Sequence, residues 1–280
     1  MLCAVALFSV MDTCMKLLSG TYPAMQVAAL RALTSLPLVL AYVGWRGAFG
    51  AMFKVRWGMH LMRGVLGIAM LSLFAFGIQT LSLAEAYSIF FIAPALITAL
   101  SVLFLKETVN AARWAAIVVG LVGVLVVLRP SGAGMLTLGG LAVLGAAAMY
   151  AVSAISARIL SRTDRSEHMV LWLMLFIAIG AGALAAPHWV AVRASDTGLL
   201  CALAVSGFLG QLAITEAFGY GEASKVAPFE YTALAFGVGF DWLLWNTLPD
   251  RYTMVGAAII IGSGLYLLRH EGSHAEAEHP

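Results

Sequence analysis

Charged residues are scarce in this sequence: they make up 11% of the 280 residues, whereas hydrophobic residues make up 62%. Soluble domains usually contain about 25% charged residues. A chain of this length cannot hide so much apolar surface in a water-soluble core. The composition therefore excludes a soluble globular fold and predicts an all-α protein that crosses a membrane many times.

Cysteine is also rare, and the expected membrane spans contain no recognisable catalytic motif. Cys3, Cys14 and Cys201 are an odd number without C-x-x-C spacing, so we expect neither a disulfide framework nor a zinc site. The pattern G-x-S-x-G and the phosphate-binding loop are absent from the sequence, and the H-E-x-x-H match HEGSH (270–274) falls in the polar tail, which we expect to be solvated rather than metal-bound. We therefore expect no cofactor and no ATP hydrolysis by this chain. A net charge of +2 without a basic patch outside the loops does not favour nucleic-acid binding.

Ten stretches are long and apolar enough to cross a bilayer, which takes about 20 residues as a helix. They cover residues 1–20, 24–45, 58–78, 84–105, 112–128, 138–159, 168–187, 197–217, 223–245 and 252–269. We expect two five-helix repeats, 1–130 and 138–269, joined by a Gly/Ser linker at 131–137. The polar tail, 270–280, is expected to be disordered and cytoplasmic.

Lysine and arginine predict the orientation of the spans. With the amino terminus in the cytoplasm, ten of the sixteen lysines and arginines fall on the cytoplasmic side, three fall outside, and three lie within spans. Cytoplasmic loops carry the excess of positive charge in membrane proteins. We therefore expect a multi-pass protein of a bacterial inner membrane with both termini in the cytoplasm.

The two halves of the chain resemble each other. Glu85-Ala86 opens the fourth span as Glu222-Ala223 opens the ninth, and WAAIVVG (114–120) matches GAAIIIG (256–262). Because five spans per half is an odd number, the second half must be inverted in the membrane, which is a recurrent transporter plan. Glycine pairs are expected to allow close helix approach, although membrane helices are rich in glycine in general. These pairs are Gly64/Gly67, Gly120/Gly123, Gly207/Gly210 and Gly237/Gly239.

Several stretches resemble the drug/metabolite transporter superfamily, of the EamA type. They include LSLAEAYSIFFIAPALITALSVLFLKETV (81–109), RWAAIVVGLVGVLVVLRP (113–130), EAFGYGEASKVAPFEYTAL (216–234) and GAAIIIGSGLYLLRHEG (256–272). The resemblance is greatest to permeases for S-adenosylmethionine or riboflavin, and it implies ten helices, a central cavity and alternating access. One departure is that Leu248-Pro249-Asp250 stands where the first half has Leu105-Lys106-Glu107. The two loops are therefore not expected to have equal roles.

Charged residues inside the spans are the first candidates for the site, because each is costly at membrane depth. Asp12 and Lys16 lie four residues apart in the favourable order for an intrahelical pair, which either meets a polar solute or merely neutralises itself. Arg31 can bind a carboxylate or phosphate, or form a structural pair with Asp12 or Glu230. Glu230 is expected to face the solute path beside the helix break at Pro228 and to exchange a proton there. Arg63 is expected to snorkel to the interface.

Aromatic residues in the same spans are the second group of candidates. Tyr87, Phe91, Tyr150 and Tyr231 offer ring faces on which a flat solute can stack, and the tyrosines add a hydroxyl. The alternative is ordinary core packing or an interface belt, which uses the same residue types.

These features predict a secondary transporter, not an enzyme, that moves a small polar or aromatic metabolite resembling riboflavin or S-adenosylmethionine. Its expected partners are this solute and the lipid bilayer, and the chain is expected to be a monomer or homodimer. One alternative is an amino-acid or drug exporter of the same fold, and a second is an intramembrane enzyme.

Overall fold

The computed structural model describes residues 1–81, 83–129, 137–246 and 250–277, without the side chains at 83–85, 241, 244–245 and 267–277. Most of the expected linker, 131–137, thus lies outside the described residues. The described part of the chain is helical and contains no β-strand. An all-α architecture is therefore confirmed.

The helices of the first half follow the expected spans closely. They are α1 (Leu2–Ser19), α2 (Ala24–Trp45), α3 (Trp57–Gly77), α4 (Leu83–Phe90), α5 (Ala93–Leu100), the π-helix η2 (Ser101–Leu105) and α6 (Ala111–Leu128). The second half contains α7 (Leu138–Leu160), α8 (Ser166–Ala185), α9 (Thr197–Tyr220), α10 (Ala223–Val226), the 3-10 helix η5 (Ala227–Tyr231), α11 (Thr232–Trp245) and α12 (Arg251–Ala277). The last helix thus includes most of the tail for which we expected disorder.

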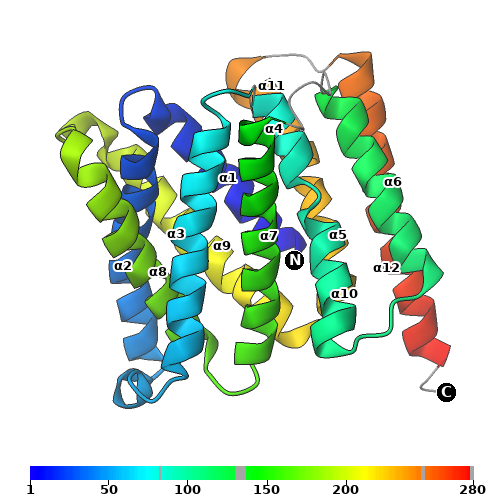
Figure 1. Cartoon of the computed structure of the whole chain (residues 1–280), viewed down its shortest axis with the longest axis horizontal. Coiled ribbons are helices and arrows are strands. Elements are labelled where there is room, and N and C mark those ends of the chain that lie inside the picture. Colours follow the sequence, from blue (N-terminus) through cyan, green and yellow to red (C-terminus); the bar gives the residue numbers. More distant parts are fainter. Residues whose placement is uncertain (82, 130–136, 247–249, 278–280) are drawn as a thin grey trace.

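Eight helical segments of the described chain are long and apolar enough to cross a membrane by themselves. They correspond to the first eight expected spans. The ninth span is divided among α10, η5 and α11, and the tenth is α12. The helices stand side by side and roughly parallel, as Figure 1 shows, which is the arrangement of a polytopic membrane bundle.

Helix pairs across the two halves hold the bundle together. The most extensive packing joins α6 to α12, α2 to α8, α3 to α7 and α1 to α9. The corresponding helices of the two halves are α1 and α7, α2 and α8, α3 and α9, and α6 and α12. If each helix is replaced by its counterpart, the α3–α7 pair becomes the α9–α1 pair, and the α2–α8 and α6–α12 pairs stay the same. This is the pattern that a two-fold relation between repeats produces.

Hydrogen bonds connect the loops to one another at each of the two ends of the bundle. At the lower end in Figure 1, the Arg56 N–H donates to Asp164 Oδ2 at 3.0 Å and Arg165 Nη2 donates to the Arg46 carbonyl at 3.3 Å. At the upper end, the Tyr22 hydroxyl donates to Asp196 Oδ2 at 2.5 Å. We call these the lower and upper ends throughout.

Glycines allow close approach at most of the positions expected from the sequence. A Cβ atom added to Gly64 would lie 2.7 Å from Phe176 Cβ, and one added to Gly210 would lie 2.9 Å from Phe8. The expectation is wrong for Gly237 and Gly239 on α11, because an added Cβ would meet nothing within 4 Å. These two glycines border open space.

The crossing of α6 and α12 yields a stability prediction. A Cβ at Gly123 would lie 2.7 Å from Ile260 Cγ1 and 3.0 Å from the Gly256 carbonyl oxygen, whereas a Cβ at Gly262 would meet nothing. Gly123→Ala should therefore lower the free energy of unfolding by about 1–3 kcal/mol through overpacking. Gly262→Ala is the matched control and should not destabilise, since alanine favours helix over glycine by about 0.5–1 kcal/mol. Thermal unfolding of both detergent-purified variants checks this, and equal melting temperatures would contradict it.

Candidate functional site

Two proline-broken spans, at corresponding positions in the halves, organise the site. Pro94 follows the break between α4 and α5, and Pro228 lies at the start of η5. Proline has no N–H, so the carbonyl four residues earlier loses its helical donor, and the helix is interrupted. The fourth span, expected as one continuous helix, is therefore broken like the ninth. Such paired interruptions are a sequence-level mark of a transporter's binding site.

Glu230 lies where η5 meets α11, next to the break at Pro228. Its Oε1 accepts a hydrogen bond of 2.8 Å from the Tyr150 hydroxyl, which comes from α7. Both side chains are half-buried. The pair joins the first and fourth spans of the second half and fixes the direction of the Glu230 carboxyl.

Asp12 lies near the middle of α1 and is exposed, although it sits at membrane depth. A charged group is costly in lipid, so an exposed carboxylate at this depth must meet water. Its charge interacts with the guanidinium of Arg31 on α2, and Arg31 also lies over the Phe8 ring at 5.6 Å. Lys16 is exposed one turn after Asp12. The structure therefore brings together three of the expected charged residues at α1 and α2.

Aromatic rings connect the Asp12 region with Glu230. Centroids lie 5.6 Å apart between Tyr87 and Phe74, 5.6 Å between Phe74 and Phe90, and 5.8 Å between Phe90 and Tyr150. We call these four residues the aromatic series. The Asp12 charge acts on the Tyr87 hydroxyl at one end, and Tyr150 binds Glu230 at the other. The series thus runs between an acid–arginine pair and a second acid.

Two expected ring contributors lie beside this series in different environments. Phe91 is half-buried, with its ring 6.4 Å from Tyr87 and 6.2 Å from Tyr231. Tyr231 is 1% exposed and packs with Val124 and Ile260 between α6 and α12. Its ring has no free face in this conformation, so we assign it to the α6–α12 packing, and a contact with solute stays a prediction.

The expectation that Arg63 snorkels to the interface is wrong. Its side chain is 3% exposed, and within the described residues its Nε and Nη1 have no hydrogen-bond partner. The neighbouring Gly64 packs on Phe176 of α8, which places this part of α3 inside the bundle.

Sequence reasoning missed Phe74, Phe90 and Phe8 as neighbours of the site. Nothing in their spacing separates them from lipid-facing phenylalanines. A signal did exist for the second helix break, because Ala93-Pro94 repeats Ala227-Pro228 in equivalent spans.

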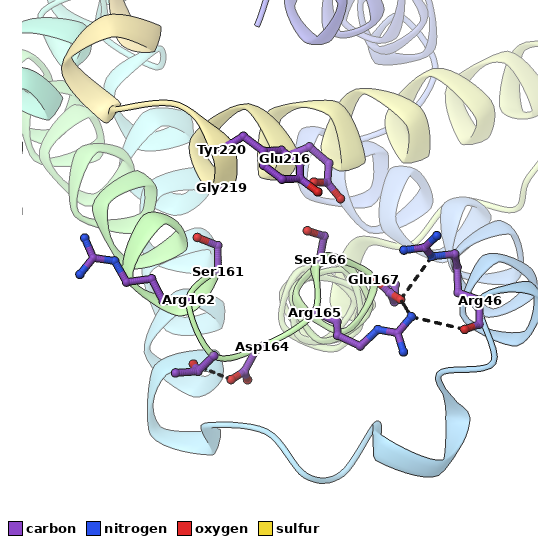
Figure 2. Close-up of a pocket in the computed structure, with 11 residues that line it drawn as sticks. Arg46, Ser161, Arg162, Asp164, Arg165, Ser166, Glu167, Glu216, Gly219 and Tyr220 are labelled. Atoms are coloured by element: carbon purple, nitrogen blue, oxygen red, sulfur yellow. Dashed lines mark hydrogen bonds and ion pairs between the residues drawn. The ribbon is translucent and has the colours of Figure 1, made fainter.

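A separate pocket of about 350 Å³ opens at the lower end, between the α7–α8 loop and the end of α9 (Figure 2). Its charges largely pair with one another: Glu167 Oε1 lies 2.5 Å from Arg165 Nη2 and 3.7 Å from Arg46 Nε. Asp164, also in its lining, binds His60 Nε2 at 2.9 Å. None of the predicted site residues lines this pocket, and the Arg46–Glu167 pair joins the end of α2 to the first turn of α8.

The central arrangement suits a solute better than a reaction. Opposite charges at Asp12 and Arg31 can hold a zwitterion or an ionised substituent, the aromatic series can accept a flat ring, and Glu230 can bind a donor. The described residues contain no group of three histidine, cysteine, aspartate or glutamate side chains that would hold a metal ion.

Comparison with known proteins shows what this architecture is related to. The model of the EamA-like transporter family matches residues 1–129 and again 137–269. The chain is also similar over most of its length to a crystal structure of a protein, with a TM-score of 0.83, 18% identity, and coverage of 94% of this chain and 93% of that one. The second likeness shows the fold alone.

Three curated relatives illustrate the range of similar proteins. A pseudopaline exporter of Pseudomonas aeruginosa is 28% identical, covering 94% of this chain and 92% of the relative. A riboflavin transporter of Vibrio cholerae is 28% identical, with coverage of 91% and 86%. An S-adenosylmethionine uptake transporter of Rickettsia conorii is 25% identical, with coverage of 96% and 90%.

The Tyr150–Glu230 pair can be tested without knowing any solute. Tyr150→Phe and Glu230→Ala should each lower stability, because each removes one partner of an intramolecular hydrogen bond, which contributes about 0.5–1.5 kcal/mol. The double variant should lose less than the sum of the singles, with a coupling of about 0.5–3 kcal/mol. Tyr150→Phe combined with Glu216→Gln on α9 is the control and should be additive. Additive losses for Tyr150 and Glu230 in thermal unfolding would refute the pairing.

Proposed function

The chain belongs to the EamA-like transporter family, and on this premise we propose that it carries a small metabolite with a flat ring and charged substituents. It is a secondary membrane transporter of small metabolites, as the family and its named relatives show. We further propose that it works by alternating access in a bacterial inner membrane, with its two halves as inverted repeats. The chain acts as a carrier and not as an enzyme.

The main support for the proposed solute site is that charged and aromatic residues lie on or beside both broken spans. Tyr87 and Phe91 belong to the fourth span, and Glu230 belongs to the ninth. Tyr150 connects the two, since its ring lies 5.8 Å from Phe90 and its hydroxyl binds Glu230. A solute between these spans therefore touches both halves, which is what coupling its binding to a relative movement of the halves requires.

The chemistry of the lining favours a particular kind of solute. Arg31 is half-buried and interacts with Asp12, so an anionic substituent that approaches Arg31 competes with the carboxylate for it. Tyr87 is 41% exposed and provides a ring on which a heterocycle can stack. Tyr150 and Glu230 offer a hydroxyl and a carboxyl for polar edges of the same ring. The riboflavin and S-adenosylmethionine relatives lend support, because both named solutes are small polar metabolites with a flat ring.

Export is the competing direction, because a named relative with similar coverage is an exporter. The same site serves either direction, since a carrier binds its solute from both sides. An amino-acid or drug exporter remains the second candidate for the solute class.

A counterflow panel tests the proposed class. Purified protein in proteoliposomes loaded with unlabelled solute should exchange labelled riboflavin or S-adenosylmethionine in preference to threonine and phenylalanine. Saturable exchange is the expected result, with the solute recovered chemically unchanged. Exchange of threonine alone would replace the proposal with the amino-acid exporter, and a converted product would indicate an enzyme.

Tyr87 should contribute stacking to the binding of such a solute. Tyr87→Leu keeps bulk but removes the ring face, and base–aromatic stacking is worth about 1–3 kcal/mol. The variant should therefore raise the half-saturating concentration about tenfold. Tyr252→Leu at the upper end, where Tyr252 contacts Arg129 and Arg251, is the control and should leave this concentration unchanged. Equal behaviour of the two variants would remove Tyr87 from the site.

The orientation of the bundle is tested by labelling single cysteines in spheroplasts. Lys54→Cys and Arg162→Cys at the lower end should react only with a membrane-permeant maleimide, because Lys/Arg-rich loops stay in the cytoplasm. Val192→Cys at the upper end should react with an impermeant reagent as well. Reaction of the lower-end cysteines with the impermeant reagent would invert the topology.

A further inference from the structure

A strained turn at the lower end brings one carboxylate under the opposite half of the chain. The π-helix η2 ends at Leu105, and the next residue, Lys106, has a φ of +57° in the left-handed region. A residue with a side chain is uncommon there, and such backbone strain concentrates at functional positions. The turn directs the next residue, Glu107, away from α5 and toward α10.

Glu107 binds the start of α10 through both carboxylate oxygens. Oε1 accepts the Ala223 N–H at 2.9 Å, and Oε2 accepts the Ser224 N–H at 2.9 Å. Burial alone would raise the pKa of Glu107, but these donors outweigh it and hold the pKa below its ordinary value. The group is therefore ionised at neutral pH, and its bonds are lost only when the pH falls through that lowered pKa.

Arg113 reinforces the same connection from α6. Its Nη1 donates to the Thr108 carbonyl at 2.8 Å and to Ser224 Oγ at 3.3 Å, and it pairs with Glu222 Oε2 at 3.0 Å. Arg113 is 7% exposed, so this pair is partly shielded from water. We call Glu107, Arg113 and Glu222, together with the Ala223 and Ser224 N–H groups that Glu107 binds, the cross-half latch.

The latch lies where the two broken spans converge. Below their breaks, α5 packs against both α10 and η5, and Ile97, Ala223 and Ala227 share one buried cluster. Above the breaks, α4 and α11 are not among the extensively packed helix pairs of the described residues, and Gly237 and Gly239 of α11 face open space. In the described residues, the two spans thus pack together at the lower end and less closely toward the upper end.

The corresponding acid at the upper end makes different contacts. Asp250 accepts the Thr253 N–H of its own helix at 2.9 Å and pairs with Arg129 Nη2 at 2.5 Å. Glu107 connects the two halves at the fourth and ninth spans, whereas Asp250 caps α12 and contacts the end of α6. The described chain is therefore latched across these spans at the lower end.

We propose that Glu107 is a gating residue, whose bonds to Ala223 and Ser224 hold the lower end of the solute path closed. This inference rests on the proposed transport function and specifies how one end of the path is regulated. Release of the two bonds frees α10 from α5, and the solute bound beside Glu230 then reaches the lower side.

Labelling kinetics test the latch without any solute. In protein lacking Cys3 and Cys201, an Ala227→Cys reporter places a thiol in the buried cluster below the breaks, and Ile97→Cys places one on the facing wall. Both should react slowly with a water-soluble maleimide in proteoliposomes. Adding Glu107→Ala should accelerate both reactions at least fivefold. Glu107→Gln should have a smaller effect, because its amide oxygen can still accept one of the two N–H groups.

Two controls separate gating from general loosening. Asp250→Ala removes an acid and a helix cap at the upper end and should leave reporter labelling unchanged. The native Cys14, which is buried on α1, should stay unreactive in Glu107→Ala. Unchanged labelling of both reporters in Glu107→Ala would overturn the proposal, and so would parallel exposure of Cys14. Because no solute is used, a negative counterflow panel leaves this result unaffected.

Discussion

The hydrogen-bonding demand of the backbone inside a bilayer governs this structure. Lipid offers no partner for an N–H or C=O group, so a spanning segment must be helical except where protein or water satisfies the freed groups. The described chain has eight helical segments of membrane length, one of which is interrupted at Pro94, and the ninth span is interrupted at Pro228. The departures are tolerated because both breaks lie inside the bundle, next to residues of the opposite half. The same constraint thus explains the bundle and the position of its site.

The charged side chains, like the backbone groups, must also be satisfied by water or by protein, and they are satisfied in different ways. Asp12 is exposed at membrane depth and needs water, whereas Glu230 is half-buried and bound by Tyr150. Glu107 lies at the end of its span, where two N–H groups of α10 satisfy it. The lower end is thus held by charge-assisted bonds between the halves. The fourth span carries Tyr87 and Phe90 of the aromatic series, and the ninth span carries Glu230, so the proposed path and its latch involve the same two spans.

Particular residues show how far sequence reasoning reached into the site. The cost of charge at membrane depth predicts Asp12, Arg31 and Glu230 as site residues, and ring stacking predicts Tyr87 and Tyr150. The structure places these five residues along one connected series. Tyr231 was selected on the same grounds and lies instead in the seam between α6 and α12. Arg63 was expected at the interface and is buried. Residue type and depth were available from the sequence in every case, but the direction of a side chain around its helix was not, because both faces of these helices are apolar.

The sequence by itself determined the class of fold, since 62% hydrophobic residues in spans of membrane length leave no soluble alternative. It also determined the break at Pro228 and the likeness of the two halves, because both follow from local sequence patterns. Only the tertiary structure decided which residues meet across the halves. The bond from Glu107 to Ser224 joins positions 117 residues apart. The sequence already predicted unequal loops at Glu107 and Asp250, but the partner of each carboxylate is seen only in the structure. Such contacts depend on how the ten spans pack together, which no local pattern encodes.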